Sequence, residues 1–277
     1  MSSTREVSFE FFPPRTPAGQ DKLRNTWRAL AAFNPRFFSV TFGAGGSTRE
    51  GTLETVLAIR GEGLEAVPHL SCVASSRDEI AAQLARYKEH GIRHLVALRG
   101  DLPSGYAAAG EFRHANELVA FIRETTGDWF TVDVACYPEY HPQTRNAADE
   151  IRNFKKKVDA GANAAITQYF YSADAYFRFI DECRAAGIGI PIVAGVMPIA
   201  NFSQLARFSD VCGAEIPRWI RFKLESLHDD SASIRAFGLD VVTGLCERLL
   251  AGGAAGLHFY TLNQALLSAE ICKRLGL

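Results

Sequence analysis

Short runs of β-branched and aromatic residues alternate with longer amphipathic stretches along almost the whole chain. A short apolar run bounded by turn residues predicts a strand, whereas apolar residues that recur every three or four positions predict a helix. Eight runs fit the strand pattern: Val7–Phe12, Phe37–Phe42, Ala66–Cys72, His94–Leu98, Thr131–Cys136, Ala164–Phe170, Pro191–Val196 and Gly256–Leu262.

Helical patterns fill the segments between these strands. Several begin at a capping residue, such as Ser76 with Glu79 three positions later, and several end at glycine, such as Gly91. The segment Pro198–Gly253 is too long for one helix and is expected to hold two or three. The other predicted helices are Gly19–Phe33, Arg49–Gly61, Ser76–His90, His114–Thr125, Ala147–Ala160, Ala173–Ala186 and, at the end, Gln264–Leu275, while Phe202–Val211 opens the long segment.

Strand–helix alternation is typical of a parallel sheet covered by helices. The first four strands recur about every 30 residues, the length of one strand–helix unit. Eight such units in 277 residues favour a single α/β domain over residues 1–277. We expect a closed (β/α)8 TIM barrel with extra helices between the seventh and eighth strands. A doubly wound open sheet is the alternative.

Composition and charge narrow the class of protein. Apolar residues make up 47% of the chain and charged residues 22%, as in ordinary soluble domains. Thirty basic residues against 31 acidic ones give a net charge of −1, which disfavours a nucleic-acid partner. No run reaches the roughly 18 apolar residues of a membrane span, and no apolar signal segment precedes the first strand. The six cysteines form no CxxC pair, so we expect reduced thiols in a cytoplasmic protein, without a disulfide framework or metal site.

Alternate positions within the strands are polar, and the opposite positions are apolar. The apolar face of a barrel strand must meet the helices, so we expect polar side chains such as His258 and Asp133 to point inward. Buried polar groups cost free energy unless they are paired or line a ligand site. Active sites of such barrels lie at the carboxyl ends of the strands, which favours an enzyme. The polar residues near these ends are Glu10, Thr41, His69, Arg99, Asp101, Tyr137 and Gln168.

Glu10 stands among aromatic residues in the run Ser8–Arg15. Burial of a carboxylate raises its pKa, as a general acid that works near neutral pH requires. The alternative is a structural ion pair between Glu10 and Arg15 or Arg99.

Three loops that follow strands each allow a functional and a structural interpretation. Leu98–Pro103 contains Arg-Gly-Asp, which fits a turn passing close to a ligand or a loop ion pair. Gly43–Ser47 is rich in glycine but does not complete the dinucleotide-binding pattern. Tyr137–Pro142 could stack on a planar cofactor or form a rigid proline-rich loop. The helix face of Asn153, Lys156 and Lys157 could likewise meet an anionic group or simply face solvent.

Together these runs resemble the methylenetetrahydrofolate reductase family over nearly the whole chain. Most of these runs indicate the family only weakly when taken alone, but their occurrence in this order is specific to it. The matching runs are Phe9–Pro14, Ser39–Ser47, Pro68–Cys72, Ala97–Pro103, Tyr137–Glu139, Lys157–Ala162, Ile166–Phe170 and His258–Asn263.

The resemblance implies an FAD-dependent oxidoreductase of one-carbon metabolism that is a homo-oligomer. NADH or NADPH would reduce FAD, which would then pass hydride to 5,10-methylenetetrahydrofolate in a ping-pong cycle, giving the 5-methyltetrahydrofolate used for methionine. Glu10 matches the general acid that protonates N10 of the folate, and Asp101 matches a carboxylate that favours the cationic iminium. A flavin-free folate-dependent methyl transferase or demethylase on the same barrel is the alternative.

The resemblance also assigns binding residues. For the folate substrate these are Gln168, Phe202, Tyr260 and Gln264. For FAD they are Thr41, Phe42, Ala44, His69, Arg99, Gly100, Asp101, Ala115, Tyr137, His141, Asn153, Lys156 and Lys157.

Three features depart from the family pattern. Gln264 stands where relatives commonly have an arginine suited to the glutamate tail of folate. His114 and Lys156 stand where relatives have tyrosine and arginine, and lysine does not keep a bidentate grip on phosphate, so weaker FAD binding is expected. The chain ends soon after the last strand, so we expect the short bacterial type without a domain that responds to S-adenosylmethionine.

Overall fold

The computed structural model describes residues 6–42, 49–100 and 110–277. Its eight strands form a closed barrel in chain order, and every neighbouring pair is parallel. The strands are β1 (Val7–Phe11), β2 (Phe37–Val40), β3 (Ala66–Ser71), β4 (His94–Leu98), β5 (Thr131–Cys136), β6 (Ala164–Thr167), β7 (Ile192–Val196) and β8 (Leu257–Tyr260).

The pairing of β1 with β8 confirms the TIM barrel and rules out the open sheet. Each predicted strand is found, but most end earlier than expected. β6 stops at Thr167 instead of Phe170, because its pairing ends at Thr167 on the β5 side and at Ile166 on the β7 side. The residues that follow therefore leave the sheet and reach the barrel mouth, by which we mean its carboxyl end.

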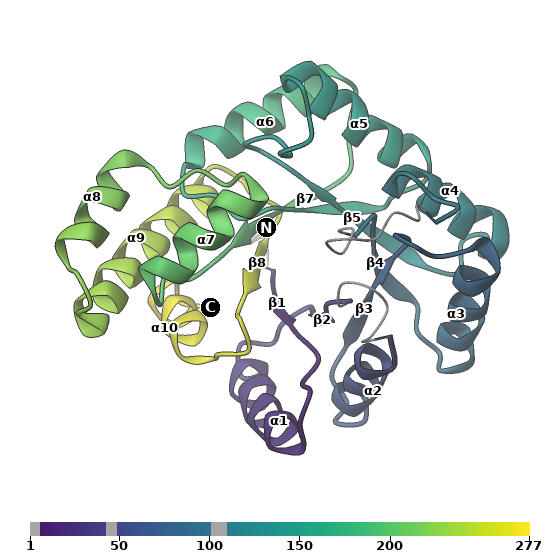
Figure 1. The fold of residues 1–277 in the computed structure, drawn as a ribbon, viewed down its shortest axis with the longest axis horizontal. Coiled ribbons are helices and arrows are strands. Elements are labelled where there is room, and N and C mark those ends of the chain that lie inside the picture. The colour runs from purple at the N-terminus through teal and green to yellow at the C-terminus, as the bar shows by residue number, and fades with distance from the viewer. Residues whose placement is uncertain (1–5, 43–48, 101–109) are drawn as a thin grey trace.

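Helices surround the strands (Figure 1). Those that follow the first six strands are α1 (Pro17–Ala31), α2 (Arg49–Arg60), α3 (Arg77–Glu89), α4 (Ala115–Thr126), α5 (Ala147–Asp159) and α6 (Ala173–Ala185). The capping box predicted at Ser76 and Glu79 is present at the start of α3. The long segment before β8 holds three helices, α7 (Phe202–Cys212), α8 (Arg218–Ser226) and α9 (Ser231–Ala251), and α10 (Leu266–Arg274) follows β8.

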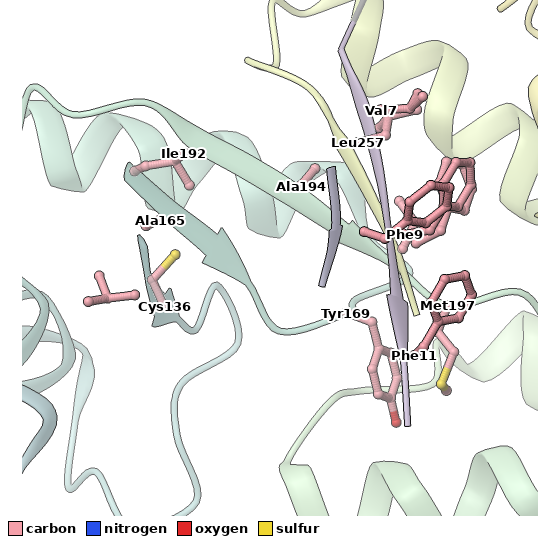
Figure 2. Packing of buried hydrophobic residues seen from close by; sticks show 14 of the residues in the cluster. Val7, Phe9, Phe11, Cys136, Ala165, Tyr169, Ile192, Ala194, Met197 and Leu257 are labelled. Atoms are coloured by element: carbon pink, nitrogen blue, oxygen red, sulfur yellow. The ribbon is translucent and has the colours of Figure 1, made fainter. Parts of the chain in front are cut away.

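The main core lies between the outer face of the barrel and the helices. Val7, Phe9 and Phe11 project from β1 into it (Figure 2). The Phe9 ring stacks on Phe38 and Phe259, with centroids 5.9 and 5.5 Å away. Burial of such large apolar side chains is the main favourable contribution to folding.

The barrel interior is layered. Its middle is apolar and contains Phe37, Val67, Val96 and Ile166. The rings of His94 and His258 contact Phe37 of this cluster, at 4.9 and 6.0 Å, so predicted inward polar residues lie directly beside it. An apolar middle layer avoids the desolvation cost that a central polar group would carry.

None of the described helices is long and apolar enough to cross a membrane. All six cysteines are free thiols, and five of them are buried.

Candidate active site

Glu10 lies in the barrel mouth between two histidines. Its side chain is 14% exposed, and its Oε2 lies 3.5 Å from Nε2 of His69 on β3 and 3.5 Å from Nε2 of His258 on β8. The alternative drawn from the sequence was a structural ion pair between Glu10 and Arg15 or Arg99. Instead, Arg99 donates to Oε1 of Gln143 at 2.6 Å, and the described partners of Glu10 are the two imidazoles.

The pKa of Glu10 lies below its usual value. Burial alone raises this pKa, but the nearby imidazoles of His69 and His258 favour the ionised carboxylate and lower the pKa by more. The expectation of a raised pKa is therefore wrong for the protein without ligand, because burial was anticipated from the sequence and the two histidines were not. Burial also lowers the pKa of His69, although Glu10 opposes that shift.

Both buried histidines keep unused polar atoms. Within the described part of the chain, neither nitrogen of His69 nor Nε2 of His258 makes a well-aligned hydrogen bond, although both Nε2 atoms lie 3.5 Å from Oε2 of Glu10. A buried polar atom without a partner costs about 1–3 kcal/mol, so these atoms fit a site that a polar ligand or water completes.

The run after β8 holds the end of β1 in place. Thr261 donates its hydroxyl to the Glu10 carbonyl at 2.7 Å. The Asn263 side chain accepts from the Phe12 amide at 2.8 Å and donates to the Phe12 carbonyl at 2.9 Å. Asn263 lies in the left-handed region, with φ of 59°, which asparagine tolerates better than most residues. Thr261 and Asn263 were missed as positioning residues, because only the run containing them was noted.

Tyr260 fills the mouth beside Glu10, its neighbour in the β1–β8 ladder. Its hydroxyl donates to the Thr167 carbonyl at 2.7 Å. Burial, together with the charge of Glu10, raises the pKa of Tyr260, so the phenol stays protonated. Gly195 on β7 makes room for this ring, because a Cβ there would overlap the Thr167 carbonyl and lie 2.8 Å from Cε2 of Tyr260.

A cavity of about 320 Å³ opens at the carboxyl ends of β4 and β5, next to the starts of α4 and α5. This volume lies in the range of ligand pockets. A larger cavity of about 690 Å³ lies between α5 and α6, outside the barrel and away from Glu10. The residues predicted for FAD that line the smaller cavity are Arg99, Gly100, Ala115, Tyr137, His141, Asn153, Lys156 and Lys157.

The smaller cavity is cationic and aromatic. Lys157 donates to the Ala135 carbonyl at 2.6 Å and lies 5.7 Å from the centre of the Tyr137 ring, and burial lowers its pKa. The rings of Tyr137 and His141 meet edge to face at 4.7 Å. Such a lining suits a ligand with an anionic group and a planar ring, so the residues present fit FAD.

The cavity wall depends on two residues with structural roles. Gly100 has φ of 84°, and a Cβ there would overlap the Ser71 hydroxyl, so this position favours glycine. Glu150, which the sequence reasoning missed, accepts from the His141 amide at 3.1 Å and from the Thr144 hydroxyl at 2.7 Å. Glu150 therefore holds the loop after β5.

The remaining predicted residues are more dispersed. Thr41 continues from β2, where its carbonyl accepts from Thr52 at 2.9 Å, and Phe42 follows it. Gln168 accepts from the Tyr169 amide at 3.0 Å, which places it directly after β6. Phe202 begins α7, half-buried against the core, whereas Gln264 is exposed. Ala44 and Asp101 lie outside the described residues. No cluster of three potential metal ligands occurs within 6–42, 49–100 and 110–277.

Comparison with known proteins identifies the family of this chain. The methylenetetrahydrofolate reductase family model matches residues 2–276. The 5,10-methylenetetrahydrofolate reductase of Salmonella typhimurium is 41% identical over 271 residues, which cover 98% of this chain and 90% of that protein. A rice protein described as a probable methylenetetrahydrofolate reductase (NADH) is 40% identical over 286 residues, covering 98% of this chain and 48% of that protein.

Among solved structures, a Clostridium thermocellum protein described as binding two copies of 5-methyl-5,6,7,8-tetrahydrofolic acid has a TM-score of 0.67. It is 15% identical, and the match covers 98% of this chain and 93% of that one, which is a likeness of fold. The family model and the Salmonella relative confirm the resemblance noted in the sequence. This chain therefore belongs to the methylenetetrahydrofolate reductase family.

Proposed function

We propose that this chain reduces 5,10-methylenetetrahydrofolate to 5-methyltetrahydrofolate with NAD(P)H, by ping-pong hydride transfer through FAD. Membership of the family supports the reaction. The observation that carries the proposal is the Glu10 carboxyl, which is held inside the barrel mouth against His69 and His258. A barrel mouth is where such folds perform chemistry.

The cavity beside β4 and β5 would hold FAD. Arg99, Lys156 and Lys157 would offset the charge of its diphosphate, and Tyr137 would contact a ring. Bound FAD would supply a two-electron carrier between the nicotinamide and the folate. The protein's own contribution is to exclude water and to orient both substrates.

Glu10 would act as the general acid of the folate step. It gives its proton to N10 of the substrate, the bond between N10 and the bridging carbon breaks, and the carbon is left as an iminium on N5 that accepts hydride. Because the pKa of Glu10 is low without ligand, the carboxyl is ionised at neutral pH. A bound folate that excludes water from the mouth would raise that pKa and favour the acid form.

The acid role is tested with Glu10→Gln, which keeps the shape of the side chain but removes its proton. We expect flavin reduction by NADH or NADPH to stay within a few-fold of the wild type, while the folate half-reaction falls by about 10²–10⁴-fold. Anaerobic stopped-flow absorbance measures the two half-reactions separately. Equal losses in both half-reactions would contradict the acid role.

The FAD site is tested with two neighbouring lysines of α5. Lys156 lines the cavity, whereas Lys155 does not and pairs with Asp159 at 2.6 Å. We expect Lys156→Met to weaken FAD binding by roughly tenfold, as for loss of one charged hydrogen bond, and Lys155→Met to leave it unchanged. Fluorescence titration of the apoprotein with FAD gives both values. Protein that takes up no FAD at all would favour the flavin-free folate enzyme.

A further inference from the structure

His258 contacts Ser8 through one ring nitrogen and faces Glu10 with the other. Its side chain is fully buried, and its Nδ1 lies 2.7 Å from Oγ of Ser8. Ser8 and His258 are paired in the β1–β8 ladder, two residues before the Glu10–Tyr260 pair. The other ring nitrogen, Nε2, lies 3.5 Å from the Glu10 carboxylate.

The two histidines beside Glu10 differ in what holds them. Both nitrogens of His69 lack a hydrogen-bond partner in the described chain, so that ring is free to meet a ligand. His258 is already engaged by Ser8, and its ring also packs against the rings of Phe37 and Tyr260, at 6.0 and 5.3 Å. An imidazole restrained on one nitrogen presents the other nitrogen in one orientation.

Two other titratable groups near the site are engaged with other partners. The Tyr260 hydroxyl donates to the Thr167 carbonyl. His94, which also contacts the Phe37 ring, pairs with Asp133 at 2.9 Å. Within the described chain, the titratable side chains that face the Glu10 carboxylate are therefore His69 on β3 and His258 and Tyr260 on β8.

We propose that His258 is a positioning residue for Glu10: Ser8 donates its hydroxyl to Nδ1, the ring carries its hydrogen on Nε2, and that N–H holds the Glu10 carboxylate. This proposal rests on the proposed acid role of Glu10. His258 donates a hydrogen bond and transfers no proton. When Glu10 protonates N10, the carboxylate that forms meets a donor that is already in place, and little reorganisation is needed.

The proposal fixes the direction of a pH effect. A hydrogen bond to the ionised form of an acid lowers the pKa of that acid. Loss of the His258 N–H should therefore let Glu10 keep its proton to higher pH. The pH above which the folate half-reaction slows should rise by about half to one unit, as one hydrogen bond implies.

Four variants test this in the FAD-loaded protein. His258→Phe removes the donor, Ser8→Ala releases the ring, and His258→Gln offers an N–H again. Ser39→Ala is the matched control for Ser8→Ala, because Ser39 pairs with Glu10 from β2 and its buried hydroxyl has no described partner. We expect an upward shift in His258→Phe, a smaller one in Ser8→Ala, partial return in His258→Gln and none in Ser39→Ala.

Two readouts separate positioning from general damage. The folate half-reaction is followed from pH 5 to 9 by stopped flow, with flavin reduction by NADH as the reference. The carboxyl band of Glu10 is titrated by infrared difference spectroscopy in the protein without folate, with Glu10→Gln to assign the band. A structural role alone would lower rates without moving either midpoint. If His258→Phe does not fold, Ser8→Ala against Ser39→Ala decides.

The failures can be told apart. If wild-type protein shows no folate half-reaction, or one that survives Glu10→Gln, the proposed function fails. If that half-reaction depends on Glu10 but its midpoint is the same in His258→Phe and wild type, only the role of His258 is overturned. Equal shifts in Ser8→Ala and Ser39→Ala would overturn it as well.

Discussion

Gly195 shows how the smallest side chain shapes the site. The Tyr260 ring occupies the space that any side chain at position 195 would take, and its hydroxyl reaches the Thr167 carbonyl. Backbone atoms of Thr167 border the same space, so the clash cannot be relieved by rotating a side chain.

Gly195→Ala should therefore destabilise the protein by about 1–3 kcal/mol, the usual cost of overpacking, and displace Tyr260. Gly244→Ala is the matched control, since a Cβ at this exposed helical glycine of α9 meets nothing within 4 Å. That change should stabilise by about 0.5–1 kcal/mol because alanine favours helices. Urea unfolding measures both free energies. Similar effects of the two substitutions would contradict the role of Gly195.

Individual residues also show where sequence reasoning stops. The position of Glu10 at the end of the first strand could be predicted from the alternation of polar and apolar residues. Its low pKa could not, because the cause includes His258 on the last strand. Alternation indicated that His258 points inward, but not which side chain it meets, since that depends on the stagger of β8 against β1.

The loop after β5 is joined to the segment before α8. The Glu139 carboxylate accepts from the Glu215 amide at 2.8 Å. Burial raises the pKa of Glu139 to about 7, although that hydrogen bond opposes the shift. The same loop carries Tyr137 and His141 into the cavity, so its attachment bears on ligand binding.

Glu139 should make stability fall as pH rises toward neutrality. Its folded pKa is about 7 against an ordinary 4.5, so the folded state binds the proton more tightly between these values. The contribution is fully present below pH 4.5 and is lost as pH rises through 7. Glu139→Gln keeps an acceptor but cannot ionise, so its stability relative to wild type should increase over this range. Urea unfolding at several pH values measures the difference, and a constant difference would refute the prediction.

The helices and strands themselves were largely predictable. Strong periodicity, the Ser76 cap and terminal glycines located the helices, and the structure confirms each within a few residues. The strand ends were less accurate because hydrophobicity continues past Thr167 into Tyr169 and Phe170, which are buried without being in the sheet. Burial and strand pairing thus coincide only in part.

Barrel closure brings distant parts of the chain into one site. Counting eight strand–helix units predicted the closed form, and the β1–β8 ladder confirms it. The cavity could be anticipated from residues near the ends of the fourth and fifth strands. Its wall residue Glu150 could not, because it carries no signal beyond an ordinary helical position.

Ligand binding should stabilise the molecule if the cavity holds FAD. Free FAD at a hundred times its dissociation constant adds about 2.7 kcal/mol to the free energy of unfolding, provided the unfolded chain does not bind it. For a chain of this size we expect Tm to rise by about 5–10 °C. Differential scanning fluorimetry with and without FAD measures this. Lys156→Met at the same FAD concentration should show a smaller rise, and no rise in wild type would contradict the assignment of the cavity.

The hydrogen bond between Ser8 and His258 joins residues 250 positions apart. During synthesis Ser8 leaves the ribosome long before His258 has been made. A nascent chain that has reached only β7 still lacks the imidazole that β8 supplies beside Glu10. The surroundings of the Glu10 carboxyl are therefore complete only when the final strand docks.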